Sequence, residues 1–364
     1  MDNFTVYQPN YSIGRNVYSQ IYSVCRPFGQ KIIAIGGEKA IAEAKDEILK
    51  SLENTDLSIT NFTWYGGQSS YENVEILMNN KEVIDADMIF AIGGGKAIDT
   101  CKCLAVKMNK PIFTFPTIAS TCAACTTVAI IYNPDGTFKE PFFFDKTPTH
   151  TFIQTEIIAK APMKYLWAGI GDTYAKHYEC VVSSRGEELA SYLALGVCIS
   201  KMCVDPLIQY GQKALADNKR GKVSFELEQT VFSIIVTTAM VSILVTLDHT
   251  PNYNSGLAHA IFYALTMFPV IEEKHLHGEV VGFGVLLLLL CDGNEKQFKR
   301  IYNFNKSVGL PTSLEEIEIT NEDLDKVIKV IPNMPDIKHY PYRVTEEMLN
   351  KAFDKLKNYH IQNQ

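Results

Sequence analysis

The sequence predicts two domains, an α/β domain at the N-terminus and an all-α domain at the C-terminus. As far as residue 115, short apolar runs alternate with amphipathic helical patterns, which indicates a parallel sheet covered on both faces. After residue 158 the pattern is helical almost to the end. A length of 364 residues suits roughly two domains, and we expect them at residues 1–161 and 162–364.

The elements of the first domain follow in a regular order. After a helix around residues 17–25, we expect strands at 31–35, within 57–64, at 88–92 and at 111–115, with helices at 38–52, 71–79 and 96–107 between them. Two β-rich runs, 126–132 and 137–144, flank the hairpin turn Asn133-Pro134-Asp135-Gly136. Gly36, Gly93 and Pro116 lie just past the carboxyl ends of strands, where ligands gather on parallel sheets.

A glycine turn gives the clearest functional signal. Gly93-Gly94-Gly95 follows an apolar strand and precedes a helix that begins near Lys96. Bare glycines let backbone N–H groups approach a phosphate, and the helix dipole adds about half a positive charge there. The alternative is a tight turn that binds nothing. A kinase-type P-loop does not fit, because Phe90 and Ala97 stand where it needs Gly and Ser or Thr.

Composition narrows the classes of partner. A net charge of −7 argues against a nucleic-acid backbone. The first ten residues lack the basic and apolar regions of a signal peptide, and the apolar run Val280–Cys291 is too short to span a bilayer. The cysteines, nine with no regular spacing, suit a reducing cytoplasm. We therefore expect a cytoplasmic protein whose partner is a small-molecule substrate.

Three residues of the helical half are candidate metal ligands. Asp172 and His259 lie in apolar sequence, where an ionised carboxylate is costly unless it is paired or metal-bound, and His277 follows in His-Leu-His-Gly-Glu. Two histidines and one carboxylate, with one position left open, suit catalytic Zn²⁺ or Fe²⁺. The alternative is that each histidine is a hydrogen-bonded core residue.

Several motifs stand in a fixed order along nearly the whole chain. They are Gly93–Lys96 with Asp99-Thr100, Pro116–Thr121, Ile130–Tyr132, Ile157–Pro162, Ala168–Asp172, Ala258–Ala260, His277–Glu279 and Gly309–Thr312. Together they resemble the iron-containing alcohol dehydrogenase superfamily, in its glycerol dehydrogenase-like branch. The resemblance implies an α/β dinucleotide-binding domain, an all-α catalytic domain of the glycerol dehydrogenase-like (dehydroquinate synthase-like) fold, and an active site in the cleft between them. We also expect a homo-oligomer.

The resemblance also assigns roles to single residues. The implied metal ligands are Asp172, His259 and His277. The implied cofactor site comprises Gly94, Gly95 and Lys96 at the pyrophosphate, Asp99 nearby, Thr117 and Ser120, and Thr126, Val128 and Tyr132 near the ribose and nicotinamide. Other branches carry a fourth ligand, a His four residues after the Asp. Lys176 stands there, and His177 is one step further round the helix, which favours a three-ligand zinc site over iron.

Two positions depart from glycerol dehydrogenases. Those enzymes carry Asp where this chain has Cys122, and a second His where it has Phe262. Cys-Ala-Ala at this point resembles the hydroxycarboxylate dehydrogenase subgroup, which reduces 2-oxo acids. We therefore predict a metal-dependent NAD(P) oxidoreductase that interconverts a small 2-hydroxy acid and its 2-oxo acid. The alternatives are a glycerol or simple alcohol dehydrogenase and a cofactor-binding protein without turnover, against which the three retained ligands argue.

Two further signals concern the cofactor and the cysteines. The acid that follows the first strand in glycerol dehydrogenases and accepts from the ribose 2′-OH is replaced by Gly37 here, and Lys39 could pair with a 2′-phosphate. This favours NADPH, although Glu38 could restore NAD binding by a shift of register. Cys122 and Cys125 form a CxxC motif, for which buried thiols are favoured over structural zinc or a redox pair.

Overall fold

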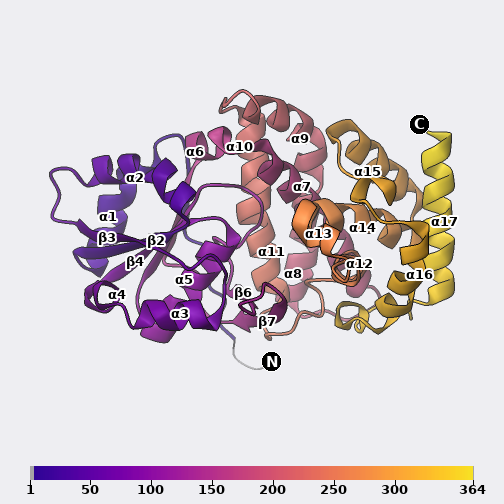
Figure 1. The fold of residues 1–364 in the computed structure, drawn as a ribbon, viewed down its shortest axis with the longest axis horizontal. Helices are drawn as coiled ribbons and strands as arrows, with labels where there is room; N and C mark the ends of the chain where they lie inside the picture. Colours follow the sequence, from indigo (N-terminus) through magenta and orange to yellow (C-terminus); the bar gives the residue numbers. More distant parts are fainter. Residues whose placement is uncertain (1–3, 364) are drawn as a thin grey trace. The chain divides into compact units, whose positions relative to one another are not determined.

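The computed structural model describes residues 4–363, and Figure 1 shows its ribbon. The chain divides into two compact units. The first unit takes the chain up to Met163 together with Ala216–Ile243, and the second takes Lys164–Leu215 together with Leu244 onward. The predicted boundary between residues 161 and 162 lies close to the first of these crossings, whereas residues 216–243, predicted as part of the helical domain, cluster with the first unit.

Residues 216–243 belong to the first unit because their helix packs against its strands and loops. Helix α10, Phe225–Phe232, begins after Ser224, whose side chain accepts a hydrogen bond from Leu227 N. Its Glu228 accepts a hydrogen bond of 3.1 Å from Thr155, and Phe232 meets Tyr11 edge-on with ring centroids 5.9 Å apart. These contacts hold the segment against the first unit. An amphipathic pattern shows that a helix packs on something, but it does not show which domain it packs on.

The main sheet of the first unit has six parallel strands in the order β1-β8-β5-β4-β2-β3. Their bounds are β1 Tyr11–Gly14, β2 Lys31–Gly36, β3 Ser58–Trp64, β4 Met88–Gly93, β5 Ile112–Pro116 and β8 His150–Gln154. The four predicted strands are confirmed as β2 to β5, and the predicted parallel sheet is confirmed with them. The sheet changes its winding direction between β2 and β4, which is where parallel sheets open a crevice for ligands.

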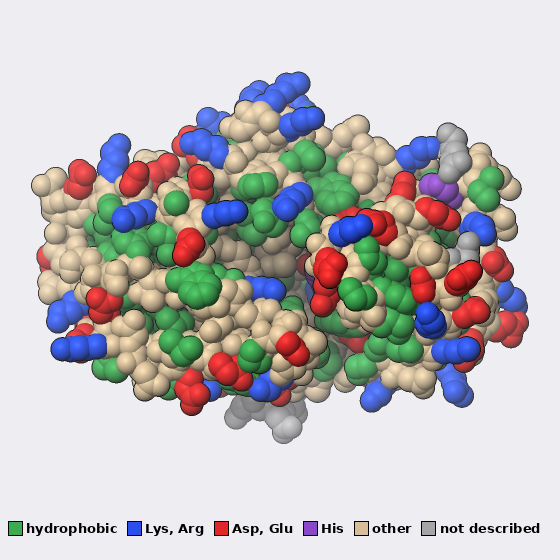
Figure 2. Space-filling model, in the orientation of Figure 1, with side chains coloured by type: hydrophobic (Ala, Val, Ile, Leu, Met, Phe, Trp, Pro, Cys, Tyr) green, Lys and Arg blue, Asp and Glu red, His purple; other side chains and the backbone are tan. Residues whose placement is uncertain are grey.

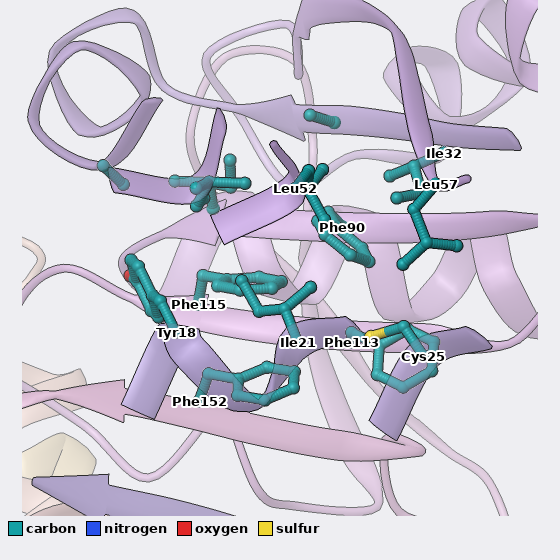
Figure 3. Close-up of a cluster of buried hydrophobic side chains, with 14 of the residues drawn as sticks. Tyr18, Ile21, Cys25, Ile32, Leu52, Leu57, Phe90, Phe113, Phe115 and Phe152 are labelled. Atoms are coloured by element: carbon teal, nitrogen blue, oxygen red, sulfur yellow. The ribbon is translucent and has the colours of Figure 1, made fainter. Parts of the chain in front are cut away.

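Helices cover both faces of this sheet, as the alternating pattern predicted. Helices α1, Ile21–Cys25, and α2, Glu38–Leu52, lie on one face, and α3, Tyr71–Met78, α4, Lys81–Asp85, and α5, Gly95–Met108, lie on the other (Figure 1). On the α1 and α2 face, Figure 3 shows an aromatic core. Phe115 stacks on Phe152 with ring centroids 5.1 Å apart and lies 4.7 Å from Phe90. Burying each such ring stabilises the fold by roughly 1.5–3 kcal/mol, which holds the strands that carry the glycine turn.

A separate two-stranded antiparallel hairpin follows the fifth strand. It consists of β6, Val128–Tyr132, and β7, Phe138–Phe143. Asn133 N donates to Thr137 O at 2.8 Å across the predicted turn. The hairpin expected around Asn133-Pro134-Asp135-Gly136 is therefore confirmed.

The remainder of the described chain is helical. The helices are α6 Thr155–Lys160, α7 Met163–Ser183, α8 Ser191–Ile199, α9 Asp205–Asn218, α11 Thr238–Val245, α12 Leu257–Leu265, α13 Pro269–Lys274, α14 His277–Cys291, α15 Glu295–Val308, α16 Asn321–Val330 and α17 Glu346–Gln362. Shorter turns, η1 Val17–Gln20, η2 Arg26–Phe28, η3 Ser200–Cys203, η5 Glu315–Ile317, η6 Ile331–Asn333 and η7 Pro335–Ile337, and the π segment η4 Ser233–Thr237 link them. In the second unit, α14 is buried and packs against α12, α15 and α17.

Two helical stretches pass a test of length and apolarity for crossing a membrane, Ser191–Asn218 and Phe225–Val245. The apolar window of Phe225–Val245 is 78% buried inside the fold, and that of Ser191–Asn218 is 33% buried. Helices in the core of a globular protein have the same length and apolar composition. Figure 2 shows basic and acidic side chains interspersed on the visible face.

Candidate metal centre and cofactor site

Three helices of the second unit place Asp172, His259 and His277 around one point. Asp172 lies in α7, His259 in the first turn of α12, and His277 is the first residue of α14. One ligand atom from each lies within 4.8 Å of the others. Oδ1 of Asp172 is 3.3 Å from Nε2 of His277 and 3.6 Å from Nε2 of His259. Within residues 4–363, no other group of His, Cys, Asp and Glu meets this criterion.

The donor set fits a divalent cation. Ligand atoms about 2.1 Å from a tetrahedral zinc ion lie about 3.4 Å from one another, and the two distances to the Asp172 oxygen bracket that value. Two imidazole nitrogens and one carboxylate oxygen also suit zinc or iron. The side chain of His277 is 38% exposed, whereas those of Asp172 and His259 are 15% and 12% exposed. A fourth position would therefore open on the side of His277.

The charges at this point are strongly coupled. Burial raises the pKa of Asp172, but hydrogen bonding to His259 and His277 outweighs it and holds the pKa well below its usual range. Burial lowers the pKa of His259, but the carboxylates of Glu179 and Asp172 outweigh it and raise the pKa to about 10. The carboxylates of Asp172 and Glu179, which stabilise the proton on His259, would also attract a divalent cation. That attraction is stronger than the attraction to a proton, because Coulomb energy scales with charge.

A pair of glycines lets the helices approach closely enough to bring the ligands together. A Cβ on Gly171 would lie 2.1 Å from the carbonyl oxygen of Gly278. A Cβ on Gly278 would lie 2.0 Å from the carbonyl oxygen of Ala168 and 2.9 Å from Cβ of Asp172. The backbones of α7 and α14 therefore touch directly beside Asp172, which no other residue type at these two positions permits.

Glu179, which sequence reasoning missed, contacts His259 twice. Its Oε2 lies 2.7 Å from Nδ1 of His259, and its Oε1 accepts from the His259 backbone N–H at 2.9 Å. The Glu179 side chain is fully buried. The signal in the sequence was an acid two helical turns after Asp172, on the same face of an apolar helix.

Two neighbours of Asp172 on α7 have other partners. Nζ of Lys176 donates to both the carbonyl oxygen and Oδ1 of Asn254, the latter at 2.8 Å. Nδ1 of His177 lies 2.8 Å from Oγ of Ser200, so this ring is hydrogen-bonded outside the cluster. Neither residue belongs to the metal-binding group of the described chain.

In the first unit, the predicted glycine turn lies at the change of winding direction in the sheet. Strand β4 ends at Gly93, and α5 begins at Gly95 after the N-cap Gly94, which offers no side-chain cap. Strand β2 ends beside it at Gly36, where a Cβ would lie 2.2 Å from the carbonyl oxygen of Ile92. The two glycine-ended strands thus leave open backbone at the position where parallel sheets bind anions.

Three of the predicted cofactor residues take part in a buried network behind this turn. Asp99 pairs with Lys102 at 2.9 Å and accepts from the backbone N–H of Ile130 at 3.1 Å. Lys102, whose side chain is 1% exposed, also donates to the hydroxyl of Thr126 at 3.1 Å and to the carbonyl of Val128. These contacts hold β6 against α5, a structural task that the sequence analysis did not assign to them.

The other predicted residues lie around the turn. Lys96 is exposed in the first turn of α5, with its Nζ 5.2 Å from the centre of the Tyr132 ring. Thr117 is buried after β5, and its N–H donates to the Gly93 carbonyl at 3.2 Å. Ser120 and Cys122 are partly exposed in the loop that follows.

The remaining candidates are Gly37 and Lys39, and the cysteines near the CxxC motif. Gly37 is the N-cap of α2, and Lys39 is exposed in its first turn. None of the nine cysteines, all of which lie within residues 4–363, forms a disulfide there. Burial raises the pKa of the Cys103 thiol to about 11 and that of Cys125 to about 12, so both are neutral thiols at pH 7.

Comparison with known proteins relates this arrangement to one enzyme family. The model for the family "Iron-containing alcohol dehydrogenase" matches residues 8–154. A glycerol dehydrogenase of Thermotoga maritima is 35% identical over 333 residues, which cover 85% of this chain and 87% of that protein. Hydroxycarboxylate dehydrogenase A of Escherichia coli is 30% identical over 334 residues, with 90% of each chain covered.

A solved structure agrees with these relatives. The crystal structure of glycerol dehydrogenase from Schizosaccharomyces pombe matches with a TM-score of 0.86 and 25% identity, covering 100% of this chain and 92% of that one. The predicted combination of an α/β dinucleotide-binding domain and a helical domain is confirmed by this likeness. The chain therefore belongs to the iron-containing alcohol dehydrogenase family of oxidoreductases, in its glycerol dehydrogenase-like branch.

Proposed function

We propose that the protein is a metal-dependent NAD(P) oxidoreductase that interconverts a small 2-hydroxy acid and its 2-oxo acid. The convergence of Asp172, His259 and His277 is the observation that carries the proposal. These residues would hold one divalent cation, which supplies Lewis-acid polarisation of the substrate oxygen when bound. The nicotinamide cofactor supplies the hydride chemistry, and the chain binds and orients the reactants.

The chain's own residues supply two binding functions. The N–H groups at the start of α5, from Gly94 and Gly95, suit the pyrophosphate of the cofactor. The exposed side of His277 suits entry of the substrate to the open position. We favour zinc over iron, because Lys176 stands at the position of the fourth ligand and its ammonium group is held by Asn254.

Cys122 supports the choice of a hydroxy acid over a polyol. A thiol lacks the carboxylate charge of Asp, so it does not repel a substrate carboxylate, and it is too weak an acceptor to bind several hydroxyls as a carboxylate would. A site that lacks partners for substrate hydroxyls can lose several orders of magnitude in discrimination. The likeness to a hydroxycarboxylate dehydrogenase supports the same choice.

The variant Cys122→Asp tests the substrate proposal. The added negative charge should lower kcat/KM for 2-oxo acids by at least about tenfold, while the control Cys122→Ser, neutral and similar in size, should stay close to the wild type. Steady-state kinetics over a panel of 2-oxo acids measures this. Equal kcat/KM in all three proteins would show that Cys122 does not face the substrate.

Oxidation of glycerol or a simple alcohol is the second candidate, and the likeness to the Thermotoga maritima enzyme favours it. A wild-type preference for glycerol over every 2-hydroxy acid, measured in the oxidative direction, would replace the first proposal with this one. Turnover with any of these substrates would exclude a cofactor-binding protein without activity.

The cofactor and the cellular setting are also proposed. We favour NADPH, because Gly37 leaves room for a 2′-phosphate and Lys39 supplies a nearby positive charge. We propose a homo-oligomer in the cytoplasm, with a small-molecule substrate as its partner. Nine cysteines that form no disulfide among the described residues suit that reducing compartment.

A further inference from the structure

The contact between Glu179 and His259 has an unusual form, because one buried carboxylate serves two donors of the same residue. Its oxygens accept from Nδ1 of the ring at 2.7 Å and from the backbone N–H at 2.9 Å. The backbone N–H can only donate, so the carboxylate is fixed by a bond that does not depend on the state of the ring. Glu179 therefore fixes the orientation of the His259 ring from two sides.

The start of helix α12 is built to admit this carboxylate. Its N-cap, Gly256, offers no side-chain cap, and the first N–H groups of a helix lack partners within it. Tyr340 accepts from Leu257 N at 2.7 Å, and Glu179 takes the N–H of His259. A Cβ on Gly256 would lie 2.4 Å from the Tyr340 hydroxyl and 3.1 Å from Cγ of Glu179. Glycine at this position makes room for two caps from other segments.

We propose that Glu179 is a positioning residue for the cation, and this inference rests on the proposed metal site. By accepting from Nδ1 of His259, it turns Nε2 of the same ring toward the proposed cation site, and that atom is 3.6 Å from Oδ1 of Asp172. By holding the backbone as well, it fixes the ring relative to the helix axis. Its buried negative charge also offsets part of the charge of the cation.

The variant Glu179→Gln puts this role to a specific test, because an amide cannot serve both donors. If its oxygen accepts from the His259 N–H, its NH₂ group faces Nδ1. The ring then relieves the conflict by moving its proton to Nε2, which blocks the atom that the cation needs. If the amide turns round, the backbone N–H loses its acceptor instead.

The measurement is a competition titration of the metal-free full-length chain with Zn²⁺ and a chelator, alongside thermal unfolding without metal. Glu179→Gln should weaken zinc binding by about 10–100-fold. Ser183→Ala is the matched control, because Ser183 is buried on the same helix and donates to the Glu179 backbone carbonyl at 2.7 Å without contacting the cluster. It should bind zinc within about twofold of the wild type, a limit set by the usual small effect of losing one such hydrogen bond.

Each outcome separates this inference from the proposed function. If the wild type binds zinc and Glu179→Gln binds it equally well, the inference is wrong and the metal site stands. If the wild type and Asp172→Ala bind zinc alike, the metal site itself is wrong. Where Glu179→Gln does not fold, Glu179→Asp replaces it, since a carboxylate one methylene shorter cannot reach both donors and should also weaken zinc binding.

Discussion

The ring of Phe262 stands edge-on to the imidazole of His277, with ring centroids 4.4 Å apart and planes inclined at 81°. Phe262 lies one helical turn after His259 on α12, so it reaches the same cluster from the same helix. The resemblance to glycerol dehydrogenases implies a second His at this position. Here an apolar ring shields one side of His277 and offers no group that could take up a proton.

Replacing Phe262 should add a titrating group to the site. We expect Phe262→His to introduce an inflection between about pH 6 and 7 in the pH profile of kcat/KM, the range in which imidazole changes charge. Phe262→Leu, which keeps the apolar contact without a titrating group, should follow the wild-type profile. Superimposable profiles of the two variants would show that position 262 does not communicate with the reaction.

The backbone contact between α7 and α14 supports a second prediction. In Gly278→Ala the new Cβ must displace the Ala168 carbonyl or Asp172, from which it would lie 2.0 Å and 2.9 Å away. We expect a loss of about 1–3 kcal/mol in the free energy of unfolding, as in other overpacked cores, together with weaker zinc binding. Metal analysis after dialysis and urea unfolding measure the two effects.

The control for this variant is a glycine substitution that should lower the stability of the chain at a position away from the metal ligands. Gly309→Ala strains a C-cap with φ +75°, but its Cβ meets nothing within 4 Å. It should destabilise the chain and retain zinc. If Gly278→Ala retains zinc as well as Gly309→Ala does, the ligand geometry does not depend on the close approach of these helices.

Much of this architecture could be predicted, for physical reasons that differ by element. The turn from β4 to α5 was predictable because an apolar strand, three glycines and an amphipathic helix are all local patterns. Strands β1 and β8 were missed, since Tyr11–Gly14 is short and unpatterned and His150–Gln154 follows a hairpin. Residues 216–243 were not predicted to belong to the first unit, because the pattern of an amphipathic helix does not indicate which domain it packs against.

The residues of the candidate site also differ in how far the sequence could predict them. Asp172, His259 and His277 could be proposed because their residue types and motifs carry the chemistry. Glu179 and Lys102 could not be proposed, because a single acidic or basic residue in a helical pattern is typical of a solvent-exposed side chain. Only the packing of α7 on α12, and of β6 on α5, reveals that each is a buried partner of a predicted residue.

Acid should destabilise the second unit through His177. Burial lowers its pKa to about 4, although Asp205 raises it and Lys201 and Arg300 lower it further. Between pH 6.5 and pH 4 the unfolded chain binds a proton that the folded ring resists, so stability falls as pH falls through this window. From pH 7 to pH 5 this amounts to about 2 kcal/mol.

The variant His177→Gln removes this proton and can still hydrogen-bond to Ser200. Its free energy of unfolding should therefore change by about 2 kcal/mol less than that of the wild type between pH 7 and pH 5. Urea unfolding at both values measures the difference. An identical loss in the two proteins would mean that the ring titrates normally in the folded chain.

The last prediction concerns the choice between NADPH and NADH. Gly37 has an extended backbone with φ −77°, and a Cβ there would lie 3.7 Å from Cε1 of Tyr65, an ordinary contact. Gly37→Asp is therefore free of steric strain, and Asp is also a favourable N-cap for α2. We expect the carboxylate to accept from a ribose 2′-OH and to repel a 2′-phosphate, which should lower the ratio of kcat/KM for NADPH over NADH by at least about tenfold.

Lys39→Ala tests the opposite charge at the same helix end. Lys39 is exposed in the first turn of α2, so its removal should raise KM for NADPH more than for NADH. Lys50→Ala is the matched control, because it removes the same charge from the last turn of α2 and should leave both KM values unchanged. Since the effect on NADPH is electrostatic, it should diminish as salt is added. A wild type that prefers NADH, or a Lys39→Ala variant that behaves as Lys50→Ala does, would overturn the assignment to NADPH.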